Sequence, residues 1–172
     1  MAHPKHQQVR QRYGCRCGYC GVSETDTGGE LTVDHFCPLT SGGDEGDANL
    51  IYACFKCNQY KADFWPSVHD LAKGLRVLHP LQDDVGGHFR ENAITCELEP
   101  TTLTGQFHIA RLRLNRPALV DFRLRRRVVS LNDAKLQLLE DEVSQLRASL
   151  AMKEAVVAGL IRMIRLRSPE GE

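Results

Sequence analysis

The sequence predicts an α+β fold, in which a small core of two strands and a helix precedes a helical C-terminal region. Two Cys-x-x-Cys pairs, at residues 17–20 and 54–57, enclose two short β-prone runs. A helical pattern follows the second pair, and Pro66 ends it because proline cannot continue a helix. In the last third of the 172-residue chain, apolar residues recur at the heptad spacing of a coiled coil.

We divide the chain into five segments on these patterns. They are a basic N-terminal lead-in with few apolar anchors (1–13), the core (14–66), a mixed α/β extension with an arginine-rich helix (67–130), an amphipathic or coiled-coil helix (131–167) and a tail (168–172). No window approaches the ~18 uninterrupted apolar residues of a transmembrane helix, and residues 1–12 lack the apolar stretch of a secretory signal. We therefore expect a cytoplasmic protein with no membrane partner.

The cysteine pairs predict a structural zinc site. Two-residue spacing lets both thiolates of a pair reach one ion, and two pairs complete a closed tetrahedral shell, here formed by Cys17, Cys20, Cys54 and Cys57. In a reducing compartment such pairs indicate metal ligands rather than disulfides, and the cysteine count of seven is odd. The alternative is a set of redox or core cysteines. Cys15 could also compete with Cys17 for the ion, whereas Cys37 and Cys96 are expected to be buried.

The predicted order within the core is cysteine pair, strand, loop, strand, cysteine pair and helix. Residues 31–33 form the first β-prone run and end at Asp34-His35, and residues 50–52 form the second. Between them, Pro38 and the Ser41-Gly42-Gly43-Asp44 stretch predict an irregular loop. We expect the helix to begin near Cys57 and to run through Lys61 to Phe64.

The extension and the C-terminal region are predicted from apolar periodicity. One face of a helix over residues 68–78 would carry Val68, Leu71, Leu75 and Leu78. A strand within residues 89–98 would bury Ile94, Cys96 and Leu98, and a short helix would bury Phe107, Ala110 and Leu114. Asn115 is expected to cap the next helix, with Pro117 in its first turn.

The C-terminal helix carries a heptad pattern with one polar break, at Lys153. The apolar positions are Leu136, Leu139, Val143, Leu146, Leu150, Val157, Leu160 and Ile164. A helix with such a stripe must bury it. We expect it to form a homo-oligomer, to dock a protein partner, or to lie on its own domain.

Positive charge is concentrated in one segment although the net charge of the chain is zero. Residues 104–130 hold seven arginines and one aspartate. Such a concentration is typical of a phosphate-binding face, and the alternative is a solvated helix face. The residues predicted to contact nucleic acid are Lys61, Arg111, Arg113, Arg116, Arg123, Arg125, Arg126 and Arg127.

Four polar residues between the cysteine pairs suit phosphodiester hydrolysis, which needs a base, a water molecule and a cation. His35 can act as the base because imidazole titrates near neutral pH. Asp34 offers a hard oxygen ligand for Mg²⁺ or Mn²⁺, and Asn58 is a second candidate ligand. Asn49 could hydrogen-bond the backbone near His35 and hold the imidazole in place. Each residue alone could instead be a turn, cap or surface residue.

Taken together, these motifs resemble the HNH endonuclease family. The matching residues are Cys17, Cys20, Asp34, His35, Pro38, Ser41, Gly42, Gly43, Asn49, Leu50, Cys54, Cys57, Asn58 and Lys61. The resemblance implies a zinc-stapled, treble-clef-like ββα-metal fold, with His35 as general base and Asn49 as the middle Asn of the name. It also implies that Asp34 and Asn58, which replace the two outer histidines, ligate one catalytic divalent ion.

The sequence therefore predicts a metal-dependent HNH endonuclease that hydrolyses DNA, or RNA, by His-activated attack of water. One alternative is a catalytically silent, zinc-dependent nucleic-acid-binding module. Another is a subunit of a larger bacterial anti-phage defence complex, whose C-terminal helix docks an effector such as an ATPase. The intact Asp34-His35 pair favours the nuclease.

Overall fold

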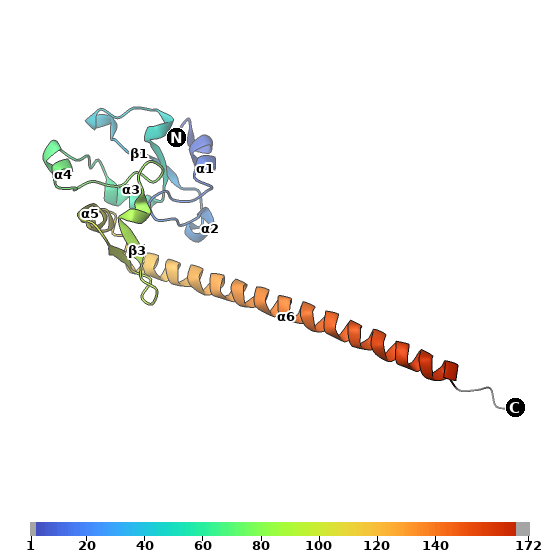
Figure 1. The fold of residues 1–172 in the computed structure, drawn as a ribbon. Helices are drawn as coiled ribbons and strands as arrows, with labels where there is room; N and C mark the ends of the chain where they lie inside the picture. Colours follow the sequence, from blue (N-terminus) through green and yellow to red (C-terminus); the bar gives the residue numbers. More distant parts are fainter. Residues whose placement is uncertain (1–2, 168–172) are drawn as a thin grey trace. The chain divides into compact units, whose positions relative to one another are not determined.

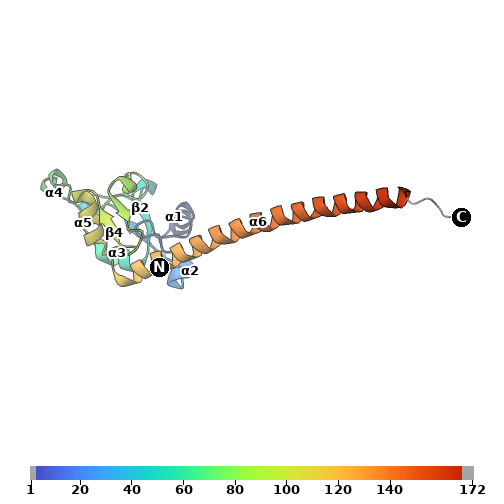
Figure 2. The ribbon, with the colours of Figure 1, turned by 60° about the horizontal axis from the view of Figure 1, so that its bottom comes forward.

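The computed structural model describes residues 3–167, with side chains up to residue 165. The chain divides into two compact units, Met1–Leu124 and Arg125–Glu172. The first unit contains two separate two-stranded sheets and all of the shorter helices, and the second consists of most of the long last helix (Figure 1 and Figure 2). The fold is thus α+β with a long C-terminal helix, as the sequence predicts.

The core of the first unit has the predicted order of strand, loop, strand and helix. Its elements are α2 (Glu24–Thr27), β1 (Thr32–His35), the 3-10 turns η1 (Leu39–Ser41) and η2 (Asp47–Asn49), β2 (Leu50–Ala53) and α3 (Phe55–Lys61). β1 and β2 pair antiparallel, with Asp34 opposite Ile51. Every residue of β2 is completely buried, so this strand forms the centre of the hydrophobic core.

Helix α3 begins two residues earlier than predicted and ends at Lys61 rather than Phe64. The thiol of Cys54 accepts a hydrogen bond from the backbone N–H of Cys57 and so caps the helix start. At the other end, Ala62 adopts a positive φ of 47°, which breaks the helical run. The helix is therefore bounded by its cysteine cap and by this turn, before Pro66 is reached.

The lead-in forms a helix of the first unit and has few apolar anchors, as the sequence predicts. Residues His6–Arg12 form helix α1, and Val9 on this helix is fully buried. Arg10 makes two hydrogen bonds with Glu24, of 2.6 and 2.7 Å, and Arg12 donates to the carbonyl of Leu50. One buried valine and these polar contacts hold α1 against the rest of the unit. The apolar pattern of the sequence does not report such polar contacts.

The predicted helix over residues 68–78 is only the short α4 (Val68–Ala72). Ser67 and Asp70 form a capping box at its start. Gly74, with φ of 72°, ends it, and the N–H of Leu75 returns to the carbonyl of Asp70. Val68 is exposed, whereas Leu78 is buried in the irregular segment that follows, so the predicted apolar face does not form.

The predicted single strand over residues 89–98 is a hairpin of β3 (Phe89–Glu91) and β4 (Leu98–Pro100). The side chain of Asn92 accepts hydrogen bonds from the N–H groups of Ile94 and Thr95 and so makes the turn. Ile94 is 89% exposed at this turn, contrary to the prediction that it is buried. Asn92 was the sequence signal for the turn.

Two helices follow the hairpin, α5 (Leu103–Arg111) and α6 (Pro117–Arg167). Pro117 is the first residue of α6, as predicted. Asn115 does not cap α6, however. Its amide accepts from the N–H of Leu98 (2.7 Å) and donates to the carbonyl of Leu98 (2.9 Å), so it extends the hydrogen bonding of β4. None of the described helices is both long and apolar enough to span a bilayer.

Burial of His108 on α5 makes the stability of this unit depend on pH. His108 accepts a hydrogen bond from the N–H of Leu78 (3.0 Å), and burial lowers its pKa to about 4. The unfolded chain takes up this proton near pH 6.5, so the free energy of unfolding should fall by about 1.4 kcal/mol per pH unit as the pH drops from there toward 4. Urea titrations of the wild type and His108→Gln at pH 7 and pH 5 measure this loss. Equal losses in both proteins would contradict it.

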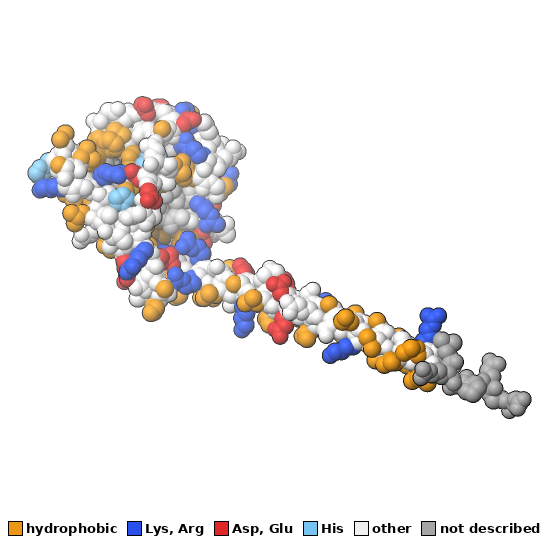
Figure 3. All heavy atoms as spheres, viewed as in Figure 1, with side chains coloured by type: hydrophobic (Ala, Val, Ile, Leu, Met, Phe, Trp, Pro, Cys, Tyr) orange, Lys and Arg blue, Asp and Glu red, His pale blue; other side chains and the backbone are white. Residues whose placement is uncertain are grey.

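Along the second unit, the predicted heptad positions are exposed over the whole described length of α6. Leu136, Leu146 and Leu150 are each about 60% exposed, and Val157 and Ile164 are similar. Figure 3 shows hydrophobic side chains along this part of the helix. The apolar stripe is therefore present as predicted, and it lies open within its own unit.

Candidate functional site

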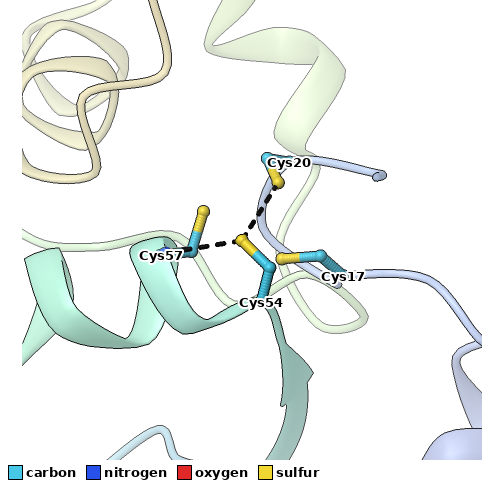
Figure 4. A group of neighbouring side chains, drawn as sticks. All are labelled: Cys17, Cys20, Cys54 and Cys57. Atoms are coloured by element: carbon cyan, nitrogen blue, oxygen red, sulfur yellow. Dashed lines mark hydrogen bonds between the residues drawn. The ribbon is translucent and has the colours of Figure 1, made fainter. Parts of the chain in front are cut away.

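The four predicted zinc ligands lie together. Cys17 and Cys20 belong to the turn before α2, and Cys54 and Cys57 to the junction of β2 and α3 (Figure 4). Their sulfur atoms all lie within 4.8 Å of one another, and those of Cys20 and Cys54 are 3.7 Å apart. Four sulfurs at about 2.3 Å from a tetrahedral zinc ion lie roughly 3.8 Å apart, so the residues fit this metal. Cys15 is not part of the group that the described residues form.

Backbone hydrogen bonds hold the first cysteine pair against the sheet. The N–H of Gly18 donates to the carbonyl of Tyr52 (2.8 Å), and the N–H of Cys17 donates to the carbonyl of Val22 (2.8 Å). Gly21 has a positive φ of 77°, which closes the turn between these segments. These bonds bring the Cys17–Cys20 pair close to the Cys54–Cys57 pair at the end of β2.

Tyr19 connects the zinc ligands to the polar residues of β1. It stands between Cys17 and Cys20, and its hydroxyl donates to Oδ2 of Asp34 (2.7 Å). Asp34 is 7% exposed, and burial raises the pKa of its carboxyl despite the nearby positive charge of Lys61. The cysteine turn thus positions a side chain that contacts Asp34 directly.

Lys61 is buried, which contradicts its prediction as a nucleic-acid contact. It is 1% exposed, and its ammonium lies 3.2 Å from Oδ1 of Asp34 and donates to the carbonyl of His35 (2.7 Å). A buried carboxylate needs a nearby positive charge, and Lys61 supplies it. Lys61 therefore supports β1 from within the core.

His35 and Asn49 lie at the beginning and end of the loop between the strands. The amide of Asn49 accepts from the N–H of Cys37 (2.7 Å) and donates to the carbonyls of Cys37 (2.9 Å) and Asp44 (2.8 Å). These bonds hold the loop at Cys37, two residues beyond His35. The sequence predicts such a bond from Asn49 to the backbone near His35. The imidazole Nε2 of His35 lies 3.1 Å from a carboxylate oxygen of Glu45.

A pocket of about 300 Å³ on the surface of the core brings together three of the four predicted catalytic residues, and Asn49 does not line it. Asp34, His35 and Asn58 all line it. Asn58 donates to the hydroxyl of Thr32 (3.2 Å) through its Nδ2 atom. Asp63 lines the pocket as well and is not among the site residues predicted from the sequence. The positive φ of Ala62 precedes Asp63, and no sequence pattern indicates this turn.

The arginines of the extension have different surroundings. Arg111 donates to the carbonyl of Lys61 (2.8 Å), and Arg113 is exposed above the ring of Tyr60. The guanidinium of Arg116 lies 3.8 to 3.9 Å from the sulfurs of Cys54 and Cys57, where it offsets thiolate charge. These residues contact the core instead of forming one uniform phosphate-binding face.

Arg123 is buried, and its prediction as a phosphate contact is wrong. It is 5% exposed and donates to the carbonyls of Cys96 (2.5 Å) and Leu114 (2.9 Å). Its guanidinium therefore bonds the backbone of the turn between β3 and β4 and of the segment between α5 and α6. Arg125, Arg126 and Arg127 follow in the second unit, where the first two are exposed.

Comparisons with known proteins agree with the motifs. Residues 17–64 match the family model described as HNH endonuclease. No curated protein and no solved structure matches the chain. The matched segment contains both cysteine pairs, the two strands and the pocket residues of β1 and α3. The chain therefore carries an HNH domain over residues 17–64.

Proposed function

We propose that this chain is a metal-dependent endonuclease that hydrolyses phosphodiester bonds in DNA. The observation that carries the proposal is one pocket, next to a four-cysteine site in an HNH domain, lined by Asp34, His35 and Asn58. In such hydrolysis the imidazole can act as the base, and the carboxylate and amide oxygens can hold the divalent cation.

The donor set of the pocket fits a hard divalent ion. Asp34, Asp63 and the amide oxygen of Asn58 are oxygen donors of the kind that Mg²⁺ and Mn²⁺ prefer. The carboxylate of Asp34 already accepts hydrogen bonds from Tyr19 and Lys61. The oxygens of Asp63 and Asn58 accept fewer such bonds among those described, so they are the more available ligands for the ion. When bound, the ion would supply positive charge to the phosphate and the leaving oxygen.

The proton in this scheme is taken by His35. The Nε2 atom of His35 faces Glu45, so Nδ1 is the nitrogen left to accept a proton from the attacking water. Asn49 holds the loop after His35 through three hydrogen bonds and thereby keeps the imidazole at the pocket. Lys61 and Tyr19 keep Asp34 in place from the buried side.

Incubation with supercoiled plasmid tests this function. With Mg²⁺ or Mn²⁺ the protein is expected to nick or linearise the plasmid, and with a chelator that leaves the thiolate-bound zinc in place it should not. An RNA of matched length tests the preference for DNA. Plasmid that is bound but never cut under any metal condition would favour the silent binding module instead.

The exposed stripe of α6 is proposed to pair with a second copy of this chain in parallel. With Leu136 at heptad position a, the flanking e and g positions carry charges of both signs. A parallel, in-register pair would place Lys135 opposite Glu140 of the second copy and Glu142 opposite Arg147. All four side chains are exposed on the described helix. This complementarity favours self-association over docking of an unrelated partner.

Charge exchange at these positions tests the pairing. Glu142→Lys should weaken the dimer by about 1 kcal/mol, roughly fivefold in dissociation constant, because two attractive pairs become repulsive. Adding Arg147→Glu should restore it. Asp141→Lys, at the solvent-facing f position, is the control and should change little. Sedimentation equilibrium measures the mass. A monomeric wild type, or a double variant as weak as Glu142→Lys alone, would contradict the parallel pairing.

A further inference from the structure

His3, His35 and Glu45 come from three separate segments of the chain and lie close together. His3 precedes α1, His35 ends β1, and Glu45 lies in the loop between η1 and η2. The Nε2 atom of His3 lies 2.7 Å from Oε2 of Glu45, and the Nε2 atom of His35 lies 3.1 Å from Oε1. One possible ligand atom from each of the three residues lies within 4.8 Å of the other two.

The imidazole of His35 lacks the hydrogen bond that this position calls for. Its Nε2 atom is shielded from solvent and has no hydrogen-bond partner, although a carboxylate oxygen of Glu45 is close. The oxygen thus lies near the nitrogen but not along the direction of an N–H bond. A buried polar atom without a partner is costly, and an ion between the two groups would satisfy both.

We propose that His3, His35 and Glu45 form a second metal site, for a transition-metal ion of the zinc class. Two imidazoles and one carboxylate are ligands of open zinc sites, in which water takes the fourth position. Ligand atoms on such an ion lie roughly 3.0 to 3.4 Å apart, given bonds of about 2.1 Å. The contact of His35 with Glu45, at 3.1 Å, has this spacing, whereas the 2.7 Å contact of His3 has the length of a hydrogen bond and would lengthen when the ion binds. Mg²⁺ is disfavoured because it prefers oxygen ligands.

Neighbouring contacts hold the N-terminal ligand at this place. The ammonium of Lys5 donates to the backbone carbonyl of Glu45 (2.8 Å) and to the carboxylate of Asp47 (2.7 Å). The segment that carries His3 is therefore attached to the loop that carries Glu45. Both histidine side chains are mostly buried, at 17% and 22% exposure, whereas Glu45 is open to solvent at 57%. An ion can enter from the side of Glu45.

Metal binding would exchange a proton at His3. In the metal-free protein, Nδ1 of His3 accepts a hydrogen bond from the N–H of Lys5 (3.1 Å), so a neutral ring carries its proton on Nε2 and donates it to Glu45. The ion takes the place of this proton on Nε2. The displaced proton moves through water to Nδ1, so the ring stays neutral, and the N–H of Lys5 then donates to water instead of to Nδ1.

The same site would control the proposed nuclease, a consequence that rests on the proposed function. An ion on Nε2 of His35 leaves the ring proton on Nδ1, the nitrogen that must accept a proton from water. His35 then cannot act as a base. Zinc-class ions should therefore inhibit cleavage that Mg²⁺ or Mn²⁺ supports, and they should do so without displacing the ion in the pocket.

Zinc content tests the site without reference to activity. After equilibration with micromolar zinc and removal of free ion, the full-length wild type should hold two zinc ions per chain by elemental analysis. His3→Ala and Glu45→Gln should each hold one, with an unchanged circular dichroism spectrum. The control is His69→Ala, at an exposed histidine on α4, which should hold two. One zinc per chain in the wild type, or two in His3→Ala, would overturn the proposal.

A cleavage assay separates this proposal from the proposed function. Each protein is compared with itself, with and without added zinc, at a fixed concentration of Mg²⁺ or Mn²⁺. We expect zinc to lower the wild-type rate at least tenfold and the His3→Ala rate much less. Equal inhibition of both proteins would overturn the inhibitory role. If no protein cuts plasmid while the zinc counts differ as expected, the nuclease proposal fails and the second metal site stands.

Discussion

Replacing Cys57 with serine is expected to leave the protein unfolded or aggregated. Cys57 is fully buried at the start of α3 and shares one site with three other cysteines. Zinc binding contributes about 10–16 kcal/mol to the folding of small zinc domains. This is as large as the total stability of a typical domain, about 5–15 kcal/mol, so no other part of the core can compensate. Circular dichroism and zinc content of the purified variant measure the loss.

Cys37→Ser is the matched control for this prediction. Cys37 lies in the loop after β1, outside the four-cysteine group, and its sulfur contacts only carbonyls of neighbouring loop residues among the bonds described. The control should retain the wild-type spectrum and the zinc of the four-cysteine site. A Cys57→Ser protein that is soluble, folded and empty of zinc at that site would disprove the structural role.

The core could be predicted from the sequence because its signals are local. The Cys-x-x-Cys pairs, the β-prone runs and the loop glycines each specify a few neighbouring residues, and the antiparallel pairing of β1 with β2 follows from their order. The boundaries of α3 were less accurate. They depend on a sulfur cap from Cys54 and on the positive φ of Ala62, and neither has a strong sequence signal.

The fate of individual charges could not be predicted, because it depends on partners far away in the sequence. Lys61 and Arg123 both stand in basic or polar stretches that resemble a nucleic-acid surface. Lys61 is buried against Asp34, 27 residues earlier, and Arg123 is buried against the carbonyl of Cys96, 27 residues earlier. Periodicity and composition do not report such pairs. The place of His3 beside His35 was missed for the same reason.

His35→Ala is expected to abolish most cleavage while leaving the fold intact. His35 lines the pocket and is the imidazole proposed to take a proton from water, a contribution of about 10²- to 10⁴-fold. The four zinc ligands and the buried strand β2 are untouched by this change. Plasmid binding should therefore survive, because His35 is not among the residues predicted to contact nucleic acid.

Asp34 is a poorer choice for this experiment, although it lines the same pocket. Its removal would leave the ammonium of Lys61 buried without its carboxylate. Breaking a buried ion pair typically costs about 3–5 kcal/mol of stability. A loss of cleavage in an Asp34 variant would therefore mix misfolding with chemistry. His35 is partly exposed and contributes no such core pair, so its loss reports on the chemistry alone.

The measurement that tests the nuclease proposal most directly is the ratio of initial cleavage rates of the wild type and His35→Ala. Both rates are taken on supercoiled plasmid with Mg²⁺ or Mn²⁺, without added zinc, and at protein concentrations that give equal plasmid occupancy in a filter-binding assay. His69→Ala serves as the control and should cut at the wild-type rate. The proposal predicts a ratio of about 10² to 10⁴. A folded, plasmid-bound His35→Ala protein that cuts as fast as the wild type would contradict it.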